Sequence, residues 1–160
     1  WSSDVCSSDL EAKKEGWAIR PYAALTNYRV TYSKNDLLSL YVDYYSYTGG
    51  AHGFTDRVHS NIDLKTGKEL QLNDLFKSGV DYKGILSKEI KRQMRLEPDK
   101  YFPETLKDWQ GISNDQPYYI EDGNLVIYFP LYEIAPYAGG IPEFIIPLTG
   151  DLPGALKIDL

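Results

Sequence analysis

Apolar and polar residues alternate along the first third of the chain, which predicts antiparallel β-strands. Tyr28, Val30 and Tyr32 alternate with polar residues in a first strand, and residues 34–36 supply a turn. The second strand, residues 37–47, has two distinct faces, because successive side chains of a strand point to opposite sides. The expected core face of this strand is apolar and carries Leu38, Leu40, Val42 and Tyr44.

A glycine-rich corner, residues 48–53 (TGGAHG), separates the second strand from a third strand that alternates over residues 57–64. Gly67 then supplies the left-handed position of a hairpin turn, and a short strand is expected at residues 69–72. If the strands beside the corner pair through their core faces, their opposite faces must also match. That opposite face brings together Tyr41, Asp43, Tyr45, Tyr47, Arg57, His59 and Asn61.

The hydrophobic period changes from two to 3.6 residues at residue 81, which predicts the main helix over about residues 81–97. Pro98 ends this helix, and Asn73 is the expected cap of a short turn before it. A short second helix is expected at residues 104–109. The apolar stripe of the main helix consists of Tyr82, Ile85, Leu86, Ile90 and Met94.

The last third of the chain returns to strands. Residues 118–121 and 125–129 flank Asp122-Gly123, a strong signal for a two-residue hairpin. Residues 125–129 are apolar on both faces, which predicts a central strand, and residues 144–148 form an edge strand between two prolines. The order of elements predicts an α+β fold, a mostly antiparallel sheet with the main helix and the short second helix packed on one side.

The first ten residues, WSSDVCSSDL, resemble translated sequencing-adaptor sequence, and we interpret them as a non-native segment. Residues 11–47 are then expected to be the last strands of a truncated upstream domain, which pair into a C-terminal domain of residues 48–160. Without Asp4 and Asp9 the formal charge changes from −6 to −4, with 17 basic against 21 acidic residues. This charge argues against nucleic-acid binding. Removal of Cys6 also excludes a disulfide framework and thiolate metal sites.

The chain has 14 tyrosines but only 5 phenylalanines, and tyrosine suits surfaces that are apolar and hydrogen-bonding at once. The face opposite the expected core, together with the flexible corner, is therefore a candidate binding surface for a sugar or a protein. The other interpretation is a sheet face that is solvated or covered by the helix and binds nothing. A second candidate is the loop of residues 132–140. The candidate ligand-binding residues are Tyr45, Tyr47, Gly49, Gly50, His52, Arg57, His59, Tyr132 and Tyr137.

Catalytic and metal sites have weaker signals. A metal site would combine His52, His59 and a nearby carboxylate, but zinc requires three or four converging ligands, and no His-Glu-x-x-His pair occurs. His59 and Ser60 are neighbours in a strand, so they point to opposite faces and form no catalytic dyad. Phosphate-loop, dinucleotide-binding and Gly-x-Ser-x-Gly motifs are absent. We therefore expect no catalytic residues, no metal and no cofactor.

Three stretches of the chain resemble one bacterial family. They are residues 47–53 (YTGGAHG), residues 61–76 (NIDLKTGK followed by LNDLF) and residues 126–139 (VIYFPLYEIAPYAG). In order and spacing they resemble the extracytoplasmic domain of RsiV-type anti-sigma factors, which is also found ahead of the catalytic domain in PdaC-type peptidoglycan deacetylases. The resemblance covers about residues 26–148, and many members of the family are classed only as a domain of unknown function.

The resemblance implies a non-catalytic, extracytoplasmic module of a bacterial envelope protein, with a lysozyme-like protein or a cell-wall glycan as its ligand. A second possibility is an accessory domain of a peptidoglycan or polysaccharide deacetylase, whose catalysis would reside in a domain absent from this chain. A metal-dependent hydrolase using His52 and His59 and a purely structural spacer also remain open. Membrane attachment would come only through a missing N-terminal anchor, and we expect a monomer.

Overall fold

The structure is a computed structural model and describes residues 13–16, 22–148 and 152–157. The predicted α+β class is confirmed, and the predicted main helix corresponds to α2. The elements are, in chain order, β1 (Ala23–Lys34), β2 (Leu37–Tyr47), β3 (Phe54–Asp63), β4 (Lys68–Glu69), η1 (Leu72–Leu75), α2 (Tyr82–Met94), η2 (Pro98–Lys100), α3 (Pro103–Lys107), β5 (Tyr118–Glu121), β6 (Asn124–Tyr128), η3 (Tyr137–Gly139), β7 (Glu143–Pro147) and α4 (Leu152–Ala155).

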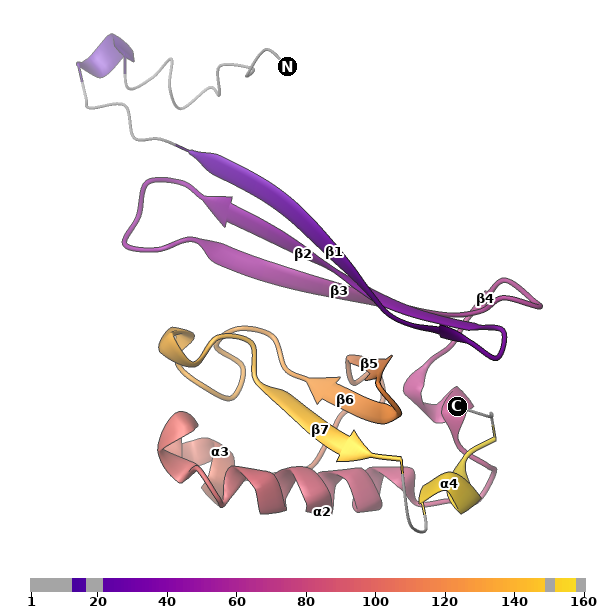
Figure 1. Cartoon of the computed structure of the whole chain (residues 1–160). Coiled ribbons are helices and arrows are strands. Elements are labelled where there is room, and N and C mark those ends of the chain that lie inside the picture. Colours follow the sequence, from indigo (N-terminus) through magenta and orange to yellow (C-terminus); the bar gives the residue numbers. More distant parts are fainter. Residues whose placement is uncertain (1–12, 17–21, 149–151, 158–160) are drawn as a thin grey trace.

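These elements form three layers (Figure 1). The long sheet has the strand order β1-β2-β3-β4, the small sheet has the order β5-β6-β7, and every pair of neighbours is antiparallel. The small sheet lies between the long sheet and α2, which runs along β7. The single sheet expected from the sequence is therefore two sheets, while the helices do lie on one side. No helix among the described residues has the length and apolar character needed to cross a membrane.

The main core lies between the small sheet and α2. Leu86, Ile90 and Met94 are fully buried, as the helical stripe predicted, whereas Ile85 is exposed. The helix begins at Asp81, whose carboxylate accepts a hydrogen bond from the backbone N–H of Gly84 at 2.9 Å. On the opposite side, the buried side chains of β5, β6 and β7 that join this cluster are Tyr118, Ile120, Leu125, Ile127, Phe144 and Ile146.

The hairpin of the small sheet is confirmed in detail. Asp122 and Gly123 have φ values of 48° and 73°, the left-handed conformation that a two-residue hairpin turn requires. The strand β6 is central and buried on both faces, and β7 is an edge strand. The strand expected at residues 69–72 is the two-residue strand β4, Lys68–Glu69. The turn η1 follows it, and the cap of this turn is Gln71 and not the expected Asn73.

A buried hydrogen-bond network joins the two sheets. The Ser39 hydroxyl donates to the Asn61 side-chain oxygen at 2.6 Å, and the Asn61 amide donates to the backbone carbonyl of Tyr118 at 3.0 Å. The backbone N–H of Ile120 donates to the Ser39 hydroxyl at 2.9 Å. Ser39 and Asn61 are completely buried, so these bonds satisfy groups that water does not reach. The network fixes the small sheet against β2 and β3.

The prediction that the apolar face of the long sheet is the core face is wrong. Tyr28 is 74% exposed, and Tyr44 and Val58 are each 49% exposed. The opposite face, which carries Tyr41 and His59, contacts the small sheet instead. Alternation shows which side chains share a face, but it does not show which face another layer will cover.

Candidate functional site

The strands beside the glycine corner pair, and their side chains share faces as the sequence predicted. Tyr41 lies opposite His59, and Asp43 lies opposite Arg57. Their shared inner face therefore holds the candidate residues of both strands. The small sheet covers the middle of this face, and the loop after β6, residues 130–141, lies beneath its end near the corner (Figure 1).

Three candidate residues from two distant segments meet in an aromatic cluster, which consists of His52, Tyr132 and Tyr137. The imidazole of His52 stacks on Tyr137 with ring centroids 3.8 Å apart and an interplanar angle of 17°. The rings of Tyr132 and Tyr137 are also stacked, with centroids 5.8 Å apart. His52 and Tyr132 are exposed, so the cluster presents aromatic surface to solvent.

Hydrogen bonds fix the orientation of the His52 ring in this cluster. Nδ1 lies 2.8 Å from the backbone carbonyl oxygen of Gly53, which can only accept, so Nδ1 carries the proton. In the neutral ring Nε2 is then an acceptor, and the Tyr132 hydroxyl lies 3.0 Å from it as the donor. Tyr132 has a φ of 68°, a left-handed conformation that non-glycine residues rarely adopt. Such strained positions often lie at binding sites.

The remaining corner residues support the aromatic cluster. The hydroxyl of Tyr47 donates to the carbonyl of Gly50 at 2.9 Å, and Gly49 has a φ of 82°. The ring of Tyr45 occupies the space that a side chain at Gly53 would need. A larger residue at position 53 would therefore have to displace the Tyr45 ring.

Arg57 lies between the sheets as a clamp and does not reach into solvent. Its guanidinium forms two hydrogen bonds with the Asp43 carboxylate, at 2.6 and 2.8 Å, and an ion pair with Glu143 of β7. It also lies over the ring of Tyr41, 3.8 Å from the centroid. Burial opposes the charge of Arg57, but the hydrogen bonds and charges of Asp43 and Glu143 outweigh it and raise the pKa of the guanidinium. Arg57 therefore remains charged and tied to both sheets.

His59 also lies between the sheets. Its Nδ1 is 3.1 Å from the Tyr128 hydroxyl, which itself donates to the backbone carbonyl of Arg57. Nδ1 therefore acts as the donor to Tyr128. Burial lowers the pKa of His59 despite the opposing charge of Glu69, so the ring is neutral at neutral pH. The ring also packs at 5.6 Å from that of Tyr118.

A groove of about 510 Å³ lies between the Arg57 clamp and the aromatic cluster. Tyr137 contributes to both the groove and the cluster, so a ligand stacked on the cluster would continue into the groove. The acidic side chains at its wall, Asp43 and Glu143, are partly exposed although both pair with Arg57. The groove is lined by Asp43, Thr55, Arg57, Leu131, Tyr137, Ala138, Gly140, Ile141 and Glu143.

The candidate residues form an aromatic and hydrogen-bonding surface, and the two histidines do not share partners. The two histidines have different partners, His52 on the loop tyrosines and His59 on Tyr128. Within the described part of the chain, no three His, Cys, Asp or Glu side chains converge to hold a metal ion. Of the carboxylates that could have completed such a site, Asp43, Asp56 and Asp63, Asp43 is already bound by Arg57. What this surface can do is stack on a flat or apolar group and hydrogen-bond to its edges.

Several residues of the site could not be found from the sequence. Glu143 lies 86 residues from Arg57 and gave no signal of its own. Tyr119 was also missed, and its hydroxyl donates to Glu143 at 3.1 Å. By contrast, the Gly-rich corner and the Tyr-rich loop at residues 132–140 were both visible as separate candidates. Their contact through His52 and Tyr137 was not predicted.

Two family models match the chain, in two segments that residues 56–72 separate. Residues 73–149 match the family described as a protein of unknown function, DUF3298, and residues 2–55 match the family described as deacetylase PdaC. The first match begins after the long sheet and includes α2 and the small sheet. The second includes β1, β2 and the corner. The domain division expected near residue 47 stays a prediction. The strands on its two sides, β2 and β3, belong to one sheet.

Two relatives from Bacillus subtilis share this sequence pattern. The chain is 33% identical to the anti-sigma-V factor RsiV over an alignment of 136 residues, and the match covers 72% of this chain and 48% of RsiV. It is 26% identical to the peptidoglycan-N-acetylmuramic acid deacetylase PdaC over an alignment of 132 residues, and the match covers 79% of this chain and 27% of PdaC. The chain thus spans about half the length of RsiV and about a quarter of that of PdaC.

Solved structures share the fold. A crystal structure of a DUF3298 family member from Bacteroides fragilis matches 97% of this chain and 63% of its own, with a TM-score of 0.70 and 26% identity. A DUF3298 family protein from Pseudomonas aeruginosa matches 94% of this chain and 69% of its own, with a TM-score of 0.64 and 24% identity. The chain therefore belongs to the DUF3298/PdaC domain family and is related to the anti-sigma factor RsiV and the deacetylase PdaC.

Proposed function

We propose that this chain is a non-catalytic, extracytoplasmic ligand-binding module of a bacterial envelope protein. Its ligand is a lysozyme-like protein or a cell-wall glycan, and the aromatic cluster with the adjoining groove is the contact surface. The observation that carries this proposal is the exposed stack of His52 on Tyr137, assembled from segments 85 residues apart. Rigid, exposed aromatic rings beside a groove are the usual anchors of protein and sugar recognition.

The arrangement of the candidate residues supports a division of roles. Tyr132, Tyr137 and His52 present the contact surface, while Tyr45, Tyr47 and the corner glycines hold the corner in shape. Arg57 and His59 act behind them as supports between the sheets, because Arg57 is only 10% exposed and His59 packs against Tyr128. The relation to RsiV, whose name identifies an anti-sigma factor, favours a sensor role.

The relation to PdaC favours a second candidate function. In an enzyme of the PdaC type, this chain would be an accessory domain that binds the wall glycan while a separate domain performs deacetylation. A hydrolase that uses His52 and His59 has less support, since the two rings have different partners and face different surroundings.

The proposal can be tested by binding to two immobilised ligands, lysozyme and purified insoluble peptidoglycan. Tyr137→Ala removes the central ring of the cluster, and we expect it to weaken capture about tenfold or more, as loss of an interface anchor does. Tyr28→Ala is the matched control, because Tyr28 is an exposed tyrosine on the opposite face of the long sheet. Equal capture of wild type, Tyr137→Ala and Tyr28→Ala would contradict the proposal. Selective loss with one ligand distinguishes a protein ligand from a glycan.

A further inference from the structure

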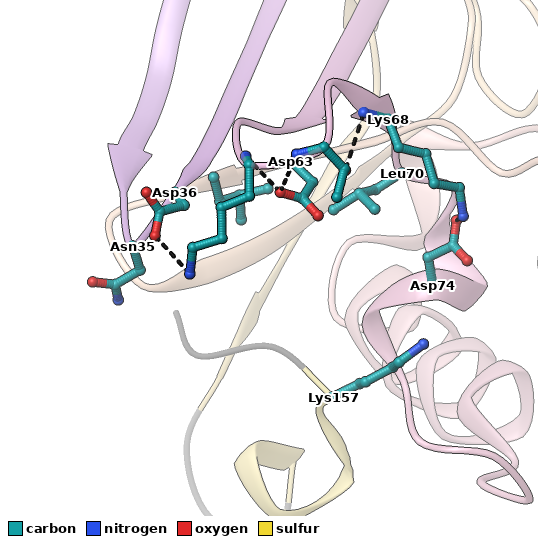
Figure 2. A pocket seen from close by; sticks show the side chains of 10 residues that line it. Asn35, Asp36, Asp63, Lys68, Leu70, Asp74 and Lys157 are labelled. Atoms are coloured by element: carbon teal, nitrogen blue, oxygen red, sulfur yellow. Dashed lines mark hydrogen bonds and ion pairs between the residues drawn. The ribbon is translucent and has the colours of Figure 1, made fainter.

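A second cavity lies at the other end of the long sheet. It has a volume of about 760 Å³ and is bounded by the β1–β2 turn, the β3–β4 turn, η1 and the C-terminal segment (Figure 2). The paired strands β2 and β3 separate it from the glycine corner by about ten residues, or roughly 30 Å. It shares no lining residue with the groove beside the aromatic cluster.

The cavity combines an apolar floor with ammonium groups at its rim. Leu37 and Leu70 line the floor, and Lys65, Lys68 and Lys157 contribute the three positive charges. Lys65 and Lys68 belong to the β3–β4 hairpin, and Lys157 follows α4. Figure 2 shows Lys68 and Lys157 approaching Asp74 from opposite sides. The cavity can therefore hold an organic body on the leucines and a charged group at the lysines.

The carboxylates of the cavity already have partners. Asp36 pairs with Lys65 at 2.9 Å, and Asp74 pairs with Lys68 at 3.0 Å and accepts from the backbone N–H of Gln71. Asp63 accepts from two backbone N–H groups of its own turn. These contacts lower the pKa of Asp74, mainly through the hydrogen bond from Lys68, and so keep that carboxylate charged.

The ammonium groups are available to a ligand. The Lys157 ammonium makes no hydrogen bond or ion pair with any residue in the described parts of the chain. The side chains of Lys65 and Lys68 are 73% and 61% exposed, and ion pairs at that exposure contribute little and exchange readily. An anion can therefore pair with Lys68 and Lys157 without breaking a buried contact.

We propose that this cavity binds a small organic anion, with a carboxylate or phosphate group at Lys68 and Lys157 and its organic body on Leu37 and Leu70. Asp74 occupies the anion position in the free protein and acts as an internal competitor. This site shares no lining residue with the groove beside the aromatic cluster, so a test of anion binding is independent of a test of the proposed function. Both carboxylate and phosphate groups satisfy the same ammonium donors.

The test is a titration of backbone amide signals by ¹H–¹⁵N NMR at low ionic strength, with two probes. Glycerol 3-phosphate carries the phosphate and N-acetylmuramic acid carries the carboxylate, while N-acetylglucosamine is the neutral control. We expect saturable shifts around residues 36–37 and 65–74 with one or both anions and none with the neutral sugar. Added salt should weaken the binding, because ammonium pairs at this exposure are screened.

Variants make the prediction specific. Lys157→Gln should weaken binding about tenfold, since a hydrogen bond to a charged group is lost. Asp74→Asn should strengthen it, because the amide keeps an oxygen for the Gln71 N–H but removes the competing charge. Lys88→Gln, on the exposed side of α2, is the matched control and should leave binding unchanged. Non-saturable shifts with both anions, or equal binding by Lys157→Gln and Lys88→Gln, would overturn the proposal.

Discussion

The inner face of the long sheet is polar and covered, whereas its outer face is apolar and exposed among the described residues. The inner face carries Ser39, Asn61 and Arg57. Each of them forms a hydrogen bond with a residue of the small sheet, and the partner of Arg57 there is Glu143 of β7. The outer face carries Tyr28, Tyr44 and Val58, about half to three quarters exposed. Polar residues thus form the interface between layers where each has a partner, because a satisfied polar group can be buried at little cost.

The two faces therefore contribute to the fold in different ways. On the inner face Ser39, Asn61 and Arg57 depend on specific partners in the small sheet, so a single substitution there leaves buried groups unpaired. On the outer face the apolar side chains of the described residues have water on one side, and their substitution removes little contact. We therefore expect substitutions on the inner face to lower the free energy of unfolding more than substitutions on the outer face.

The largest effect is expected for Asn61→Ala. Asn61 is completely buried, and its removal leaves the Ser39 hydroxyl and the Tyr118 carbonyl without the partners that it supplies. We expect a loss of about 3 kcal/mol in the free energy of unfolding, from the unpaired groups and the small void together. Urea unfolding monitored by circular dichroism measures it.

The control for this substitution is Asn27→Ala. Asn27 is an exposed asparagine of the neighbouring strand β1, so the same chemical change there should alter stability by less than about 0.5 kcal/mol. Equal destabilisation by the two substitutions would show that the buried network does not hold the sheets together.

A smaller effect, dependent on pH, is expected from His59. Burial lowers the pKa of its imidazole below the ordinary value of about 6.5, so the folded state binds a proton less readily than the unfolded state. The stabilisation from neutral His59 is fully present above the unfolded-state pKa and is lost as the pH falls below it. Unfolding free energies measured between pH 7.5 and 5.5 should therefore decrease toward the acid side.

His59→Gln should flatten this dependence, because glutamine does not titrate. His52→Gln is the control, since it alters the exposed aromatic cluster and leaves His59 between the sheets. A slope that persists unchanged in His59→Gln would assign the pH dependence to other groups. Carboxylates with depressed pKa values, such as Asp74 and Glu89, lose their protons well below this pH window.

Local features of the fold were predictable from the sequence, but the distant segments against which they pack were not. The bounds of β2 and β5, the Asp122-Gly123 turn and the start of α2 at Asp81 follow from short-range patterns and were predicted correctly. Which face of the long sheet is covered depends on residues 118–128, which lie at least 55 positions beyond β3. Alternation carries no information about such a distant layer.

The same limit applies to the candidate site. The glycine corner and the Tyr-rich loop were recognised separately, because glycines interrupt a strand pattern and tyrosines suit binding surfaces. The stacking of His52 on Tyr137 joins them only in the folded chain. Arg57 and His59 were correctly placed on one face with Tyr41 and Asp43, but the small sheet that covers this face could not be inferred from their own strands.

The smallest effect is expected on the outer face, for Val58→Thr. Val58 is 49% exposed and lies opposite Val42 in the register of β2 and β3. Threonine keeps the β-branched shape that strands favour, so the change should alter the free energy of unfolding by less than about 0.5 kcal/mol. Urea unfolding is again the measurement. A loss comparable to that of Asn61→Ala would mean that the outer face is buried against another surface in solution, and the contrast between the two faces would then disappear.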